Sequence, residues 1–393
     1  MNVYVRDLTR QLGELGILVD VFTRSQDEHV PHVLHDLGYG NRVVHIPAGP
    51  EEPLAKEELA KYLDDFVVGV RAFAESKGLK YDIIHSHYWM SGVAAGELKK
   101  AWNIPVIHMF HTLGVMKQRV ARADEAVEGS YRLEGEKKTL RIADKIIAAT
   151  PAELAQLQWL YQADTRKIVI IPPGVDLSRF YPIPPDEAKE FIGIPPCERV
   201  LLFVGRIEPL KGIDVLIHAI AIMRQQGVHV CLSVIGGDSG AGSDTVSDEM
   251  ARLQAVREQS GMDDMVFFLG KKSQDTLPYY YSASEAVVLP SHYESFGMVA
   301  LEAMACGTPV VASQVGGLAF LIQDGVTGYT FPVDDPQELA DRLITLLCDP
   351  ELRRRMGMQA ASFARDYGWE RISSRILNAY KEVLNREQTL REG

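Results

Sequence analysis

The chain has 393 residues, of which 46% are hydrophobic and 24% are charged, and this composition excludes a disordered or fibrous protein. Its 41 basic and 53 acidic residues give a net charge of −12, which argues against a nucleic-acid-binding protein with a basic face. No apolar run reaches the roughly 20 residues of a membrane-spanning helix, and the first residues show no signal-peptide pattern.

The cysteines carry no spacing that is typical of a zinc site or a redox motif. There are four of them, Cys197, Cys231, Cys306 and Cys348. We expect buried thiols rather than disulfides, and therefore a protein of a reducing compartment with a cytoplasmic location.

The chain is expected to begin with a helix over Asn2–Leu15, because Val3, Leu8, Leu12 and Leu15 give it an apolar face and Gly16 follows as a C-cap. Short apolar runs rich in β-branched residues then predict strands at Ile17–Phe22, Tyr81–His85, Val106–Phe110, Lys145–Ala149 and Lys167–Ile171. A second set of such runs lies at Arg199–Val204, Val228–Ile235, Met265–Leu269, Ala286–Leu289 and Pro309–Ala312. Helical patterns separate many of these runs, which predicts α/β domains with parallel sheets.

A proline-rich segment divides the two sets of strands. Residues 172–196 hold seven of the 20 prolines, which favour extended backbone over helix. We therefore expect Rossmann-like domains over residues 1–171 and 197–368, joined by this linker and facing a cleft at the carboxyl ends of their strands. The tail, residues 369–393, contains an amphipathic helix over Trp369–Leu384 that we expect to pack on a domain.

Two cations follow the first predicted strand of the second domain. Gly205 permits a tight turn at the end of that strand, and Arg206 and Lys211 lie in the loop after it. Arg can bind two phosphate oxygens at once and Lys is a mobile point charge, so the pair suits a diphosphate. Two solvated surface cations are an equal alternative. Neither a P-loop nor a dinucleotide-binding glycine motif is present.

The segment from Pro290 to Pro309 is the most specific in the chain. A helix is expected to start near Ser295 and to end at Gly307, so its first N–H groups lie around residues 297–299 and form an anion site. Glu294 and Glu302 are eight positions apart, and each carboxylate can accept hydrogen bonds from sugar hydroxyls. One could hold a hexose and the other a ribose.

With these motifs the sequence resembles the retaining glycosyltransferases of family 4, which have the GT-B fold. The resemblance implies a nucleotide-sugar donor and a C-terminal helix that returns to the first domain. It implies donor-binding roles for Gly205, Arg206, Lys211, Lys272, Glu294, Phe296, Gly297, Met298, Val299 and Glu302. It places the catalytic function on Arg206, Lys211 and Glu294, together with His111 beside the reaction centre.

Motifs in the first half are similar to two groups of that family, the inositol-phosphate N-acetylglucosaminyltransferases of mycothiol synthesis and the sucrose-phosphate synthases. These motifs are His85-Ser-His-Tyr-Trp89, Phe110-His-Thr-Leu-Gly114 and Arg132-Leu-Glu-Gly-Glu136. Both groups use phosphorylated acceptors. The resemblance implies acceptor-binding roles for Asn2, Lys56, Tyr88, Thr112 and Arg132, whose cations, phenol and hydroxyl suit a phosphate dianion.

The sequence predicts no metal ion and no cofactor. His85 and His87 could in principle bind a metal, but no third ligand is evident, and a packed core histidine is favoured for His85. The resemblance also implies a magnesium-like site at Tyr281, Ser282, Ser284 and Thr308, which match the relative poorly.

The sequence departs from its relatives at its first motif. In them Met-Asn is preceded by two glycines and by a strand, whereas here Met1 begins the sequence. We therefore expect the first sheet to lack an inner strand beside Ile17–Phe22 and Tyr81–His85, and the chain to be a shortened form that is less stable and weak or inactive in transfer.

The sequence predicts a retaining transferase that moves a hexosyl group from a UDP-linked sugar to a phosphorylated polyol or sugar. Three alternatives stay open: a lipid or polysaccharide acceptor, a non-catalytic nucleotide-sugar-binding protein, and a UDP-sugar epimerase. No nucleic-acid partner is expected, and a homodimer is one alternative for the oligomeric state.

Overall fold

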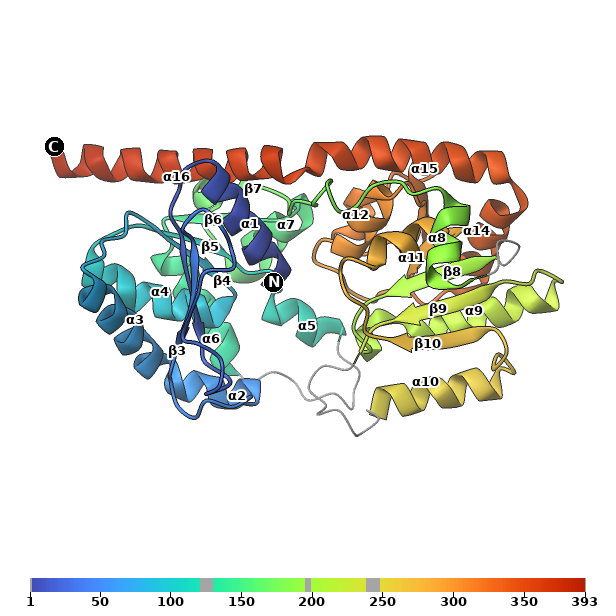
Figure 1. The fold of residues 1–393 in the computed structure, drawn as a ribbon, viewed down its shortest axis with the longest axis horizontal. Helices are drawn as coiled ribbons and strands as arrows, with labels where there is room; N and C mark the ends of the chain where they lie inside the picture. Colours follow the sequence, from blue (N-terminus) through green and yellow to red (C-terminus); the bar gives the residue numbers. More distant parts are fainter. Residues whose placement is uncertain (1, 121–129, 195–198, 238–247, 393) are drawn as a thin grey trace. The chain divides into compact units, whose positions relative to one another are not determined.

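The structure is a computed structural model that describes residues 2–120, 130–194, 199–237 and 248–392, without the side chains of residues 120 and 387–392. The chain divides into two compact units (Figure 1). The first contains residues up to Gly174 together with the segment from Trp369 onward, and the second contains Val175–Gly368. Cys197 and Met1 lie outside the described residues.

The strands of the first unit form two sheets among the residues that the structure describes. Their bounds are β1 Asp20–Arg24, β2 Val33–Leu34, β3 Arg42–Ile46, β4 Ile84–His87, β5 Val106–Met109, β6 Lys145–Ala148 and β7 Ile168–Ile170. One sheet has the order β1-β3-β2, in which β1 is parallel and β2 antiparallel to β3. The other has the order β4-β5-β6-β7 and is parallel throughout. The split falls between β1 and β4, which lie in the two regions that the sequence analysis named as neighbours of an absent strand.

The helices of the first unit pack on these sheets. They are α1 Asn2–Glu14, α2 Lys56–Leu59, α3 Leu63–Lys77, α4 Trp89–Trp102, α5 Gly114–Val120, α6 Ser130–Ile142, α7 Pro151–Tyr161 and α16 Trp369–Glu392. The predicted first helix is confirmed as α1, whose Tyr4, Leu8 and Leu12 are buried, and Gly16 has a φ of +80° just after it.

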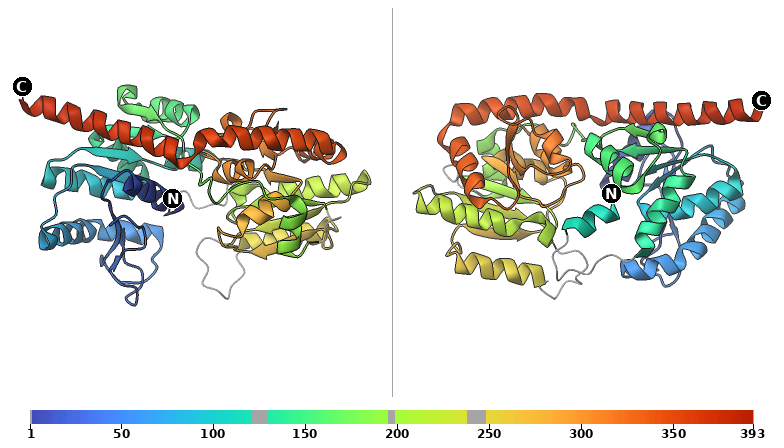
Figure 2. Two further views of the ribbon diagram at one scale, coloured as in Figure 1. Left: turned by 45° about the horizontal axis from the view of Figure 1, so that its top comes forward. Right: turned by 180° about the vertical axis from the view of Figure 1, so that it is seen from behind.

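The C-terminal helix belongs to the first unit, as the resemblance implied. Helix α16, red in Figures 1 and 2, packs against α1. Arg375 Nη2 donates to the Ile170 carbonyl oxygen at 2.7 Å, and Lys145 forms an ion pair with Glu382. The helix is longer than the predicted Trp369–Leu384 because its polar last turns continue beyond the apolar face.

The second unit contains one six-stranded parallel sheet with the order β10-β9-β8-β11-β12-β13. Its strands are β8 Val200–Val204, β9 Cys231–Ile235, β10 Val266–Gly270, β11 Ala286–Leu289, β12 Val310–Ser313 and β13 Gly328–Phe331. Its helices are α8 Pro185–Ile192, α9 Ile213–Gln225, α10 Asp248–Gln259, α11 Leu277–Ala283, α12 Met298–Ala305, α13 Leu318–Leu321, α14 Pro336–Cys348 and α15 Pro350–Ala364. The predicted α/β class is confirmed in both units, and the described sheets are parallel except for the antiparallel pairing of β2 with β3.

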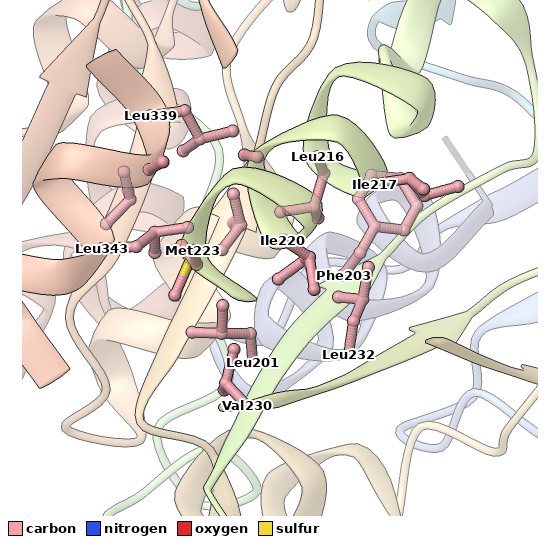
Figure 3. Close-up of a cluster of buried hydrophobic side chains, with 14 of the residues drawn as sticks. Leu201, Phe203, Leu216, Ile217, Ile220, Met223, Val230, Leu232, Leu339 and Leu343 are labelled. Carbon is pink, nitrogen blue, oxygen red and sulfur yellow. The ribbon is translucent and has the colours of Figure 1, made fainter. Parts of the chain in front are cut away.

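The core of the second unit lies between its sheet and the helices α9 and α14. Figure 3 shows side chains of β8, β9, α9 and α14 gathered in one apolar cluster, and these residues are fully or almost fully buried. The labelled members are Leu201, Phe203, Leu216, Ile217, Ile220, Met223, Val230, Leu232, Leu339 and Leu343. Strand ends that stand on such a packed base can hold loop residues in fixed positions.

Two further features differ from the sequence expectation. The proline-rich segment 172–196 is not extended throughout, because Pro184 and Pro185 occupy the start of helix α8, where a missing N–H costs nothing. The described cysteines Cys231, Cys306 and Cys348 are free thiols, but only Cys306 is buried. Cys348, the last residue of α14, is exposed.

Candidate functional site

In the second unit, glycines position the loop that follows β8. The Gly205 N–H donates to the Ile235 carbonyl oxygen at 2.9 Å. A Cβ on Gly236 would lie 1.8 Å from the Gly205 carbonyl oxygen, so the two loops touch through their backbones. Gly212 has a φ of +62°, and a Cβ there would lie 2.2 Å from the Pro290 carbonyl oxygen. The loop that carries Arg206 and Lys211 is therefore fixed against the segment after β11.

This packing brings two of the predicted donor ligands together. Lys211 Nζ donates to Glu294 Oε2 at 2.6 Å, although 83 positions separate them in the sequence. Their side chains are 18% and 22% exposed, so the pair is accessible without being solvated on all sides. A cation and a carboxylate that are held at the carboxyl ends of parallel strands can meet a ligand from the same direction.

Two other predicted cations lie apart from this pair. Arg206 Nη1 donates to Glu208 Oε1 at 2.5 Å, and the Arg206 side chain is 52% exposed. The Lys272 ammonium lies 5.9 Å from the centre of the Tyr280 ring, which is a cation–π distance. Among the described residues, no hydrogen bond or ion pair connects Arg206 or Lys272 to Glu294.

The segment before α12 contains the residues that the sequence analysis assigned to an anion site. The helix begins at Met298, not near Ser295, because Gly297 adopts a φ of +107° that ends the preceding turn. The first N–H groups of a helix, here those of Met298 and Val299, have no acceptor within the helix and lie at the positive end of its dipole. Phe296 is buried and anchors the segment beneath them.

A glycine pair after β12, which the sequence analysis did not single out, supports this segment. The Gly317 N–H donates to the Glu294 carbonyl oxygen at 2.9 Å. A Cβ on Gly316 would lie 2.0 Å from the same oxygen. A Gly-Gly pair that begins three residues after the end of an apolar strand is the sequence signal that could have identified this close approach.

Glu302 lies inside the unit. It is 7% exposed and accepts a hydrogen bond of 2.7 Å from the Tyr281 hydroxyl. Burial, together with the Glu302 carboxylate, raises the pKa of Tyr281 well above its ordinary value, so this phenol stays a donor. The ribose-binding role of Glu302 stays a prediction.

His292 is a polar residue at this edge that sequence reasoning missed. Its backbone N–H donates to the Leu210 carbonyl oxygen at 2.9 Å, and its Nδ1 lies 3.4 Å from Asp334 Oδ1. Its Nε2 is buried and has no hydrogen-bond partner among the described residues. A histidine three positions after the end of a buried strand, beside a glycine loop, was the available signal.

In the first unit, the ends of β4 and β5 bring two histidines together. His87 Nδ1 and His111 Nε2 are 3.0 Å apart, and the Tyr4 ring of α1 makes edge contacts with both imidazoles. Burial lowers the pKa of His111 to about 3, and burial together with the neighbouring His85 lowers the pKa of His87 well below its ordinary value. Both rings are therefore neutral near pH 7, and one donates to the other.

The side chain of His85 is buried in the first unit and is held by a hydrogen bond. Its Nδ1 lies 2.7 Å from the Tyr380 hydroxyl of α16, and burial lowers its pKa to about 3. Over the described ranges, no three His, Cys, Asp or Glu side chains gather as a metal-binding group would. The burial of His85 and its hydrogen bond with Tyr380 agree with the sequence preference for a packed histidine at this position.

Three of the predicted acceptor-binding residues lie together, and one of them, the buried Arg132, contacts the other two. Arg132 Nη2 donates to the Thr112 carbonyl oxygen at 3.0 Å and to Thr112 Oγ1 at 3.1 Å, and its guanidinium lies 5.3 Å from the Tyr88 ring centre. Arg132 Nε also donates to Glu136 Oε1 at 2.9 Å, with the two side chains 1% and 0% exposed.

Glu136 was quoted in the sequence motif but was given no role there. It also accepts hydrogen bonds from the Gly114 N–H at 2.9 Å and from the Tyr161 hydroxyl. The buried arginine is thus neutralised within the unit by a carboxylate that several donors hold in place.

The remaining acceptor candidates are elsewhere. Lys56 is exposed at the start of α2, and Asn2 is exposed at the start of α1. No hydrogen bond or ion pair within the described part of the chain joins either side chain to Arg132. Their acceptor-binding roles stay predictions.

The magnesium-like set does not fit a hard cation. Thr308 Oγ1 donates to the Tyr281 carbonyl oxygen, and Ser284 Oγ donates to the Tyr280 carbonyl oxygen, both at 2.7 Å. Ser282 Oγ accepts from the Ile183 N–H at 3.2 Å. These four residues contribute no carboxylate, which Mg²⁺ sites in proteins normally include, so no chemical step is assigned to a metal here.

Comparison with known proteins shows similarity along nearly the whole chain. A family model described as Glycosyltransferase Family 4 matches residues 1–179, and one described as Glycosyl transferases group 1 matches residues 185–363. The D-inositol 3-phosphate glycosyltransferase of Actinosynnema mirum is 41% identical over 388 residues, which are 98% of this chain and 92% of that protein. D-inositol 3-phosphate glycosyltransferase 2 of Catenulispora acidiphila is 40% identical over all of this chain and 92% of that protein.

Solved structures are similar in fold. Sucrose-phosphate synthase from Thermosynechococcus elongatus superposes with a TM-score of 0.89 at 34% identity, covering 98% of this chain and 94% of that one. Anabaena HepE in complex with UDP-glucose superposes with a TM-score of 0.77 at 20% identity, covering 97% and 95% of the two chains, which shows a shared fold. Among the described helices, none combines the length and the apolar character needed to cross a membrane.

Proposed function

We propose a donor and an acceptor for this chain, which belongs to the family 4 glycosyltransferases and is a hexosyltransferase of GT-B fold. The donor is a UDP-linked hexose, and the acceptor is a phosphorylated polyol or sugar. The transfer retains the configuration of the anomeric carbon. The two relatives named above take an inositol phosphate by their names, and the structural neighbour at 34% identity is named for a sucrose phosphate.

The observation that carries the donor assignment is the ion pair between Lys211 and Glu294 beside the start of α12. Without a ligand, each side chain satisfies the other. When a nucleotide diphosphate sugar binds, Lys211 turns to the diphosphate, and Glu294 accepts hydrogen bonds from the hexose hydroxyls. One residue pair can then address both the leaving group and the transferred sugar.

Charge stabilisation of the leaving group is the main catalytic contribution that these residues can make. As the bond from the anomeric carbon to the phosphate oxygen breaks, negative charge grows on the diphosphate. Lys211, the exposed Arg206 and the N–H groups at the start of α12 can stabilise that charge, and electrostatic stabilisation of this kind is usually the largest contribution to catalysis. Loss of one charged hydrogen bond costs about 1.5–3 kcal/mol.

Proton transfer does not require a protein base in this proposal. The acceptor hydroxyl attacks from the face that the leaving group departs from, and the departing phosphate oxygen takes its proton. His111 is neutral near pH 7, so it can exchange hydrogen bonds with a sugar hydroxyl but adds no charge.

The acceptor phosphate is assigned to the group formed by Tyr88, Thr112 and Arg132, with Lys56 and Asn2 as further ligands. The first three are in contact, and the first two offer hydroxyl groups beside a guanidinium. A homodimer and a cytoplasmic location stay predictions from the sequence.

Release of UDP tests the function directly. UDP-glucose and UDP-N-acetylglucosamine are each incubated with inositol 3-phosphate, fructose 6-phosphate, the unphosphorylated acceptors, or no acceptor. We expect UDP release that depends on a phosphorylated acceptor. A protein that binds UDP-sugars and releases no UDP with any acceptor contradicts the proposal.

The variant Lys211→Ala tests the donor site in the same assay. We expect it to lower kcat/KM by ten-fold or more, because about 1.5–3 kcal/mol of charged hydrogen bonding is lost. Arg224→Ala is the matched control, since Arg224 forms an exposed ion pair with Asp264 at the end of α9. Wild-type turnover and donor affinity in the Lys211 variant would make Lys211 a surface cation only.

A further inference from the structure

The second unit contains a cavity at the edge of its sheet opposite to the donor site. Its volume of about 650 Å³ lies within the range of small-molecule sites in proteins. Glu285 and Pro309, which directly precede β11 and β12, lie in its wall, whereas Glu294 lies beyond the carboxyl end of β11. The cavity is therefore separate from the residues assigned to the donor.

The wall of this cavity comes from helices that pack on one another in the order α8-α11-α12-α15 (Figure 1). Helices α8, α11 and α15 contribute side chains to it, as does the turn after α12. Pro182 and Ile183 of the proline-rich segment also line it. The sequence analysis read this segment as a linker only.

The charged side chains of the wall are predominantly basic. Among the described residues they are the cations Lys189, Arg353, Arg354 and Arg365 and the carboxylates Asp186 and Glu285. Four cations and two carboxylates leave a formal excess of two positive charges. An enclosed space with a net positive wall favours an anion over a neutral or cationic ligand.

One carboxylate in this wall is shared by two of the cations. Lys189 Nζ lies 3.5 Å from Glu285 Oε1, and Arg353 Nε lies 2.7 Å from Glu285 Oε2. The Glu285 backbone N–H donates to the Val200 carbonyl oxygen at 2.8 Å, which fixes the residue at the start of β11. The Lys189 side chain is only 7% exposed, so its charge is weakly screened by water.

One face of α15 carries two arginines with room between them. Arg354 and Arg365, which directly follows the helix, are eleven positions apart, or about three turns, and so lie on the same face. The cavity-lining residues between them are Gly357, Met358, Ala361 and Ser362, most of which are small. A Cβ on Gly357 would lie 2.1 Å from the Gly307 carbonyl oxygen, so α15 is held directly against the turn after α12.

Both of these arginines can bind a ligand at little cost. Arg354 forms an ion pair with Glu351 in which the side chains are 61% and 75% exposed, and such pairs contribute little to stability. The Arg365 side chain forms no hydrogen bond or ion pair with the residues that the structure describes. A guanidinium group binds two phosphate oxygens at once, which makes phosphate the anion that this pair suits best.

The neutral polar groups of the wall are compatible with an anion. Three members of the magnesium-like set line this cavity, and their hydroxyl groups can contact a polar ligand. Carbonyl groups at the end of α12 are already used, because Glu302 accepts from the Cys306 N–H at 3.1 Å and Met304 accepts from the Gly307 N–H at 2.9 Å. The positive wall also repels a divalent cation, in agreement with the poor fit of that set to Mg²⁺.

We propose that this cavity binds the phosphate group of a small metabolite between the arginines on the face of α15. Arg354 and Arg365 contact the phosphate oxygens, and the Lys189–Glu285–Arg353 group keeps the wall positive behind them. The cavity is larger than a phosphate ion requires, so the hydroxyl-bearing part of a sugar or polyol phosphate fits beside the serine and threonine side chains. The site is independent of the proposed donor and acceptor.

Hydrogen exchange of the full chain tests this proposal with fructose 6-phosphate and inorganic phosphate as probes. Sodium chloride at the same ionic strength is the reference, because it screens charge without occupying a phosphate site. Peptides that cover α8 and α15 report on this cavity, and peptides that cover α6, which contains Arg132, report separately on the proposed acceptor site. The dependence of protection on probe concentration gives a dissociation constant for each region.

Arg354→Ala and Arg355→Ala are matched variants. The two residues are neighbours on α15 and both are exposed, but only Arg354 lines the cavity. Both substitutions, and the double variant Arg354→Ala/Arg365→Ala, remove exposed side chains, so the fold should be kept. Lys211→Ala, which changes the donor site, should leave protection of α15 unchanged.

We expect fructose 6-phosphate to slow exchange in α8 and α15 beyond the sodium chloride reference. Arg354→Ala should raise the dissociation constant about ten-fold, the double variant should abolish the protection, and Arg355→Ala should change the constant less than two-fold. Equal affinity for inorganic phosphate would identify the free ion as the ligand, and weaker binding of inorganic phosphate would identify the ester. If neither probe protects α15 beyond sodium chloride, or if Arg354→Ala has no more effect than Arg355→Ala, the cavity is not a phosphate site.

Discussion

The buried pair of Arg132 and Glu136 gives a sharp test, because the structure assigns it a role in stability as well as in acceptor binding. Arg132→Ala removes the hydrogen bonds of the guanidinium to Glu136 and Thr112, and leaves the Glu136 carboxylate buried at 0% exposure. Breaking a buried ion pair from one side costs about 3–5 kcal/mol. Glu136 keeps the Gly114 N–H and the Tyr161 hydroxyl as donors, so we expect the lower end, about 3 kcal/mol.

The tryptophans offer a probe that reports on this unit alone. All four, Trp89, Trp102, Trp159 and Trp369, belong to the first unit. Urea unfolding followed by tryptophan fluorescence therefore measures the unit that contains Arg132, even if the two units unfold separately.

A matched control is available on α3. Arg71 and Glu75 have the same four-residue spacing as Arg132 and Glu136, but they are 49% and 70% exposed with a closest distance of 3.8 Å. Arg71→Ala should change the free energy of unfolding by about 1 kcal/mol or less. If Arg132→Ala costs no more than Arg71→Ala, the argument from burial is wrong.

Kinetics separate the structural role of Arg132 from a role in acceptor binding. If Arg132 binds the acceptor phosphate, the alanine variant should raise KM for a phosphorylated acceptor and leave the unphosphorylated one unaffected. Equal losses on both acceptors would assign Arg132 to structure only.

Three further predictions concern pH, helix geometry and charge. Burial raises the pKa of Glu153 from 4.5 to about 7, so the folded state keeps a proton that the unfolded state releases. The first unit should therefore lose about 3 kcal/mol of stability as the pH rises from about 4.5 to about 7. Glu153→Gln, which keeps an acceptor for the Ala149 N–H, should flatten this profile in urea titrations; an unchanged profile would contradict the assignment. Gly297→Ala should raise KM for the donor, because a φ of +107° is strained for alanine by about 1–3 kcal/mol and the helix start must move. Gly227→Ala, at a φ of +78° with open space around it, is the control in the same kinetic assay. His111→Asn should lower kcat by a factor that stays constant from pH 5.5 to 8.5, since the His111 pKa of about 3 keeps the imidazole neutral throughout; a factor that changes across this range would refute it.

The sequence was most informative where a strand is buried on both faces. The runs at Ala286–Leu289 and Lys145–Ala149 are continuous and apolar, and the strands β11 and β6 lie there. The short strands β2, β3 and β13 were missed, because β2 has only two residues and because β3 and β13 mix buried positions with partly buried ones. Burial on both faces leaves a clear composition signal, and burial on one face leaves a weak one.

The residue types of the candidate site could be predicted from the sequence, but the ion pairs and backbone contacts between them could not. The motifs around Arg206, Glu294 and Arg132 identified cations and carboxylates near strand ends. Their ionic partners come from tertiary structure, such as the 83 positions between Lys211 and Glu294, which no local pattern encodes. The glycine pair at 316–317 and the imidazole of His292 were missed for the same reason, since their importance depends on which backbone approaches them.

The burial of each ion pair also indicates how readily its arginine or lysine can leave the carboxylate and bind a ligand. Three of the cations that the sequence assigned to phosphate, Arg206, Lys211 and Arg132, each have a carboxylate partner, so ligand binding at them exchanges one ionic contact for another. The exchange is easiest for Arg206 at 52% exposure, intermediate for Lys211 at 18%, and hardest for Arg132 at 1%. Separating a buried pair leaves an uncompensated charge that costs several kcal/mol, whereas an exposed pair is worth about 1 kcal/mol or less. Arg206 and Lys211 can therefore change partners when a diphosphate arrives. Arg132 must keep Glu136 while it contacts the acceptor, so its main contribution is to hold Thr112 and Tyr88 in position.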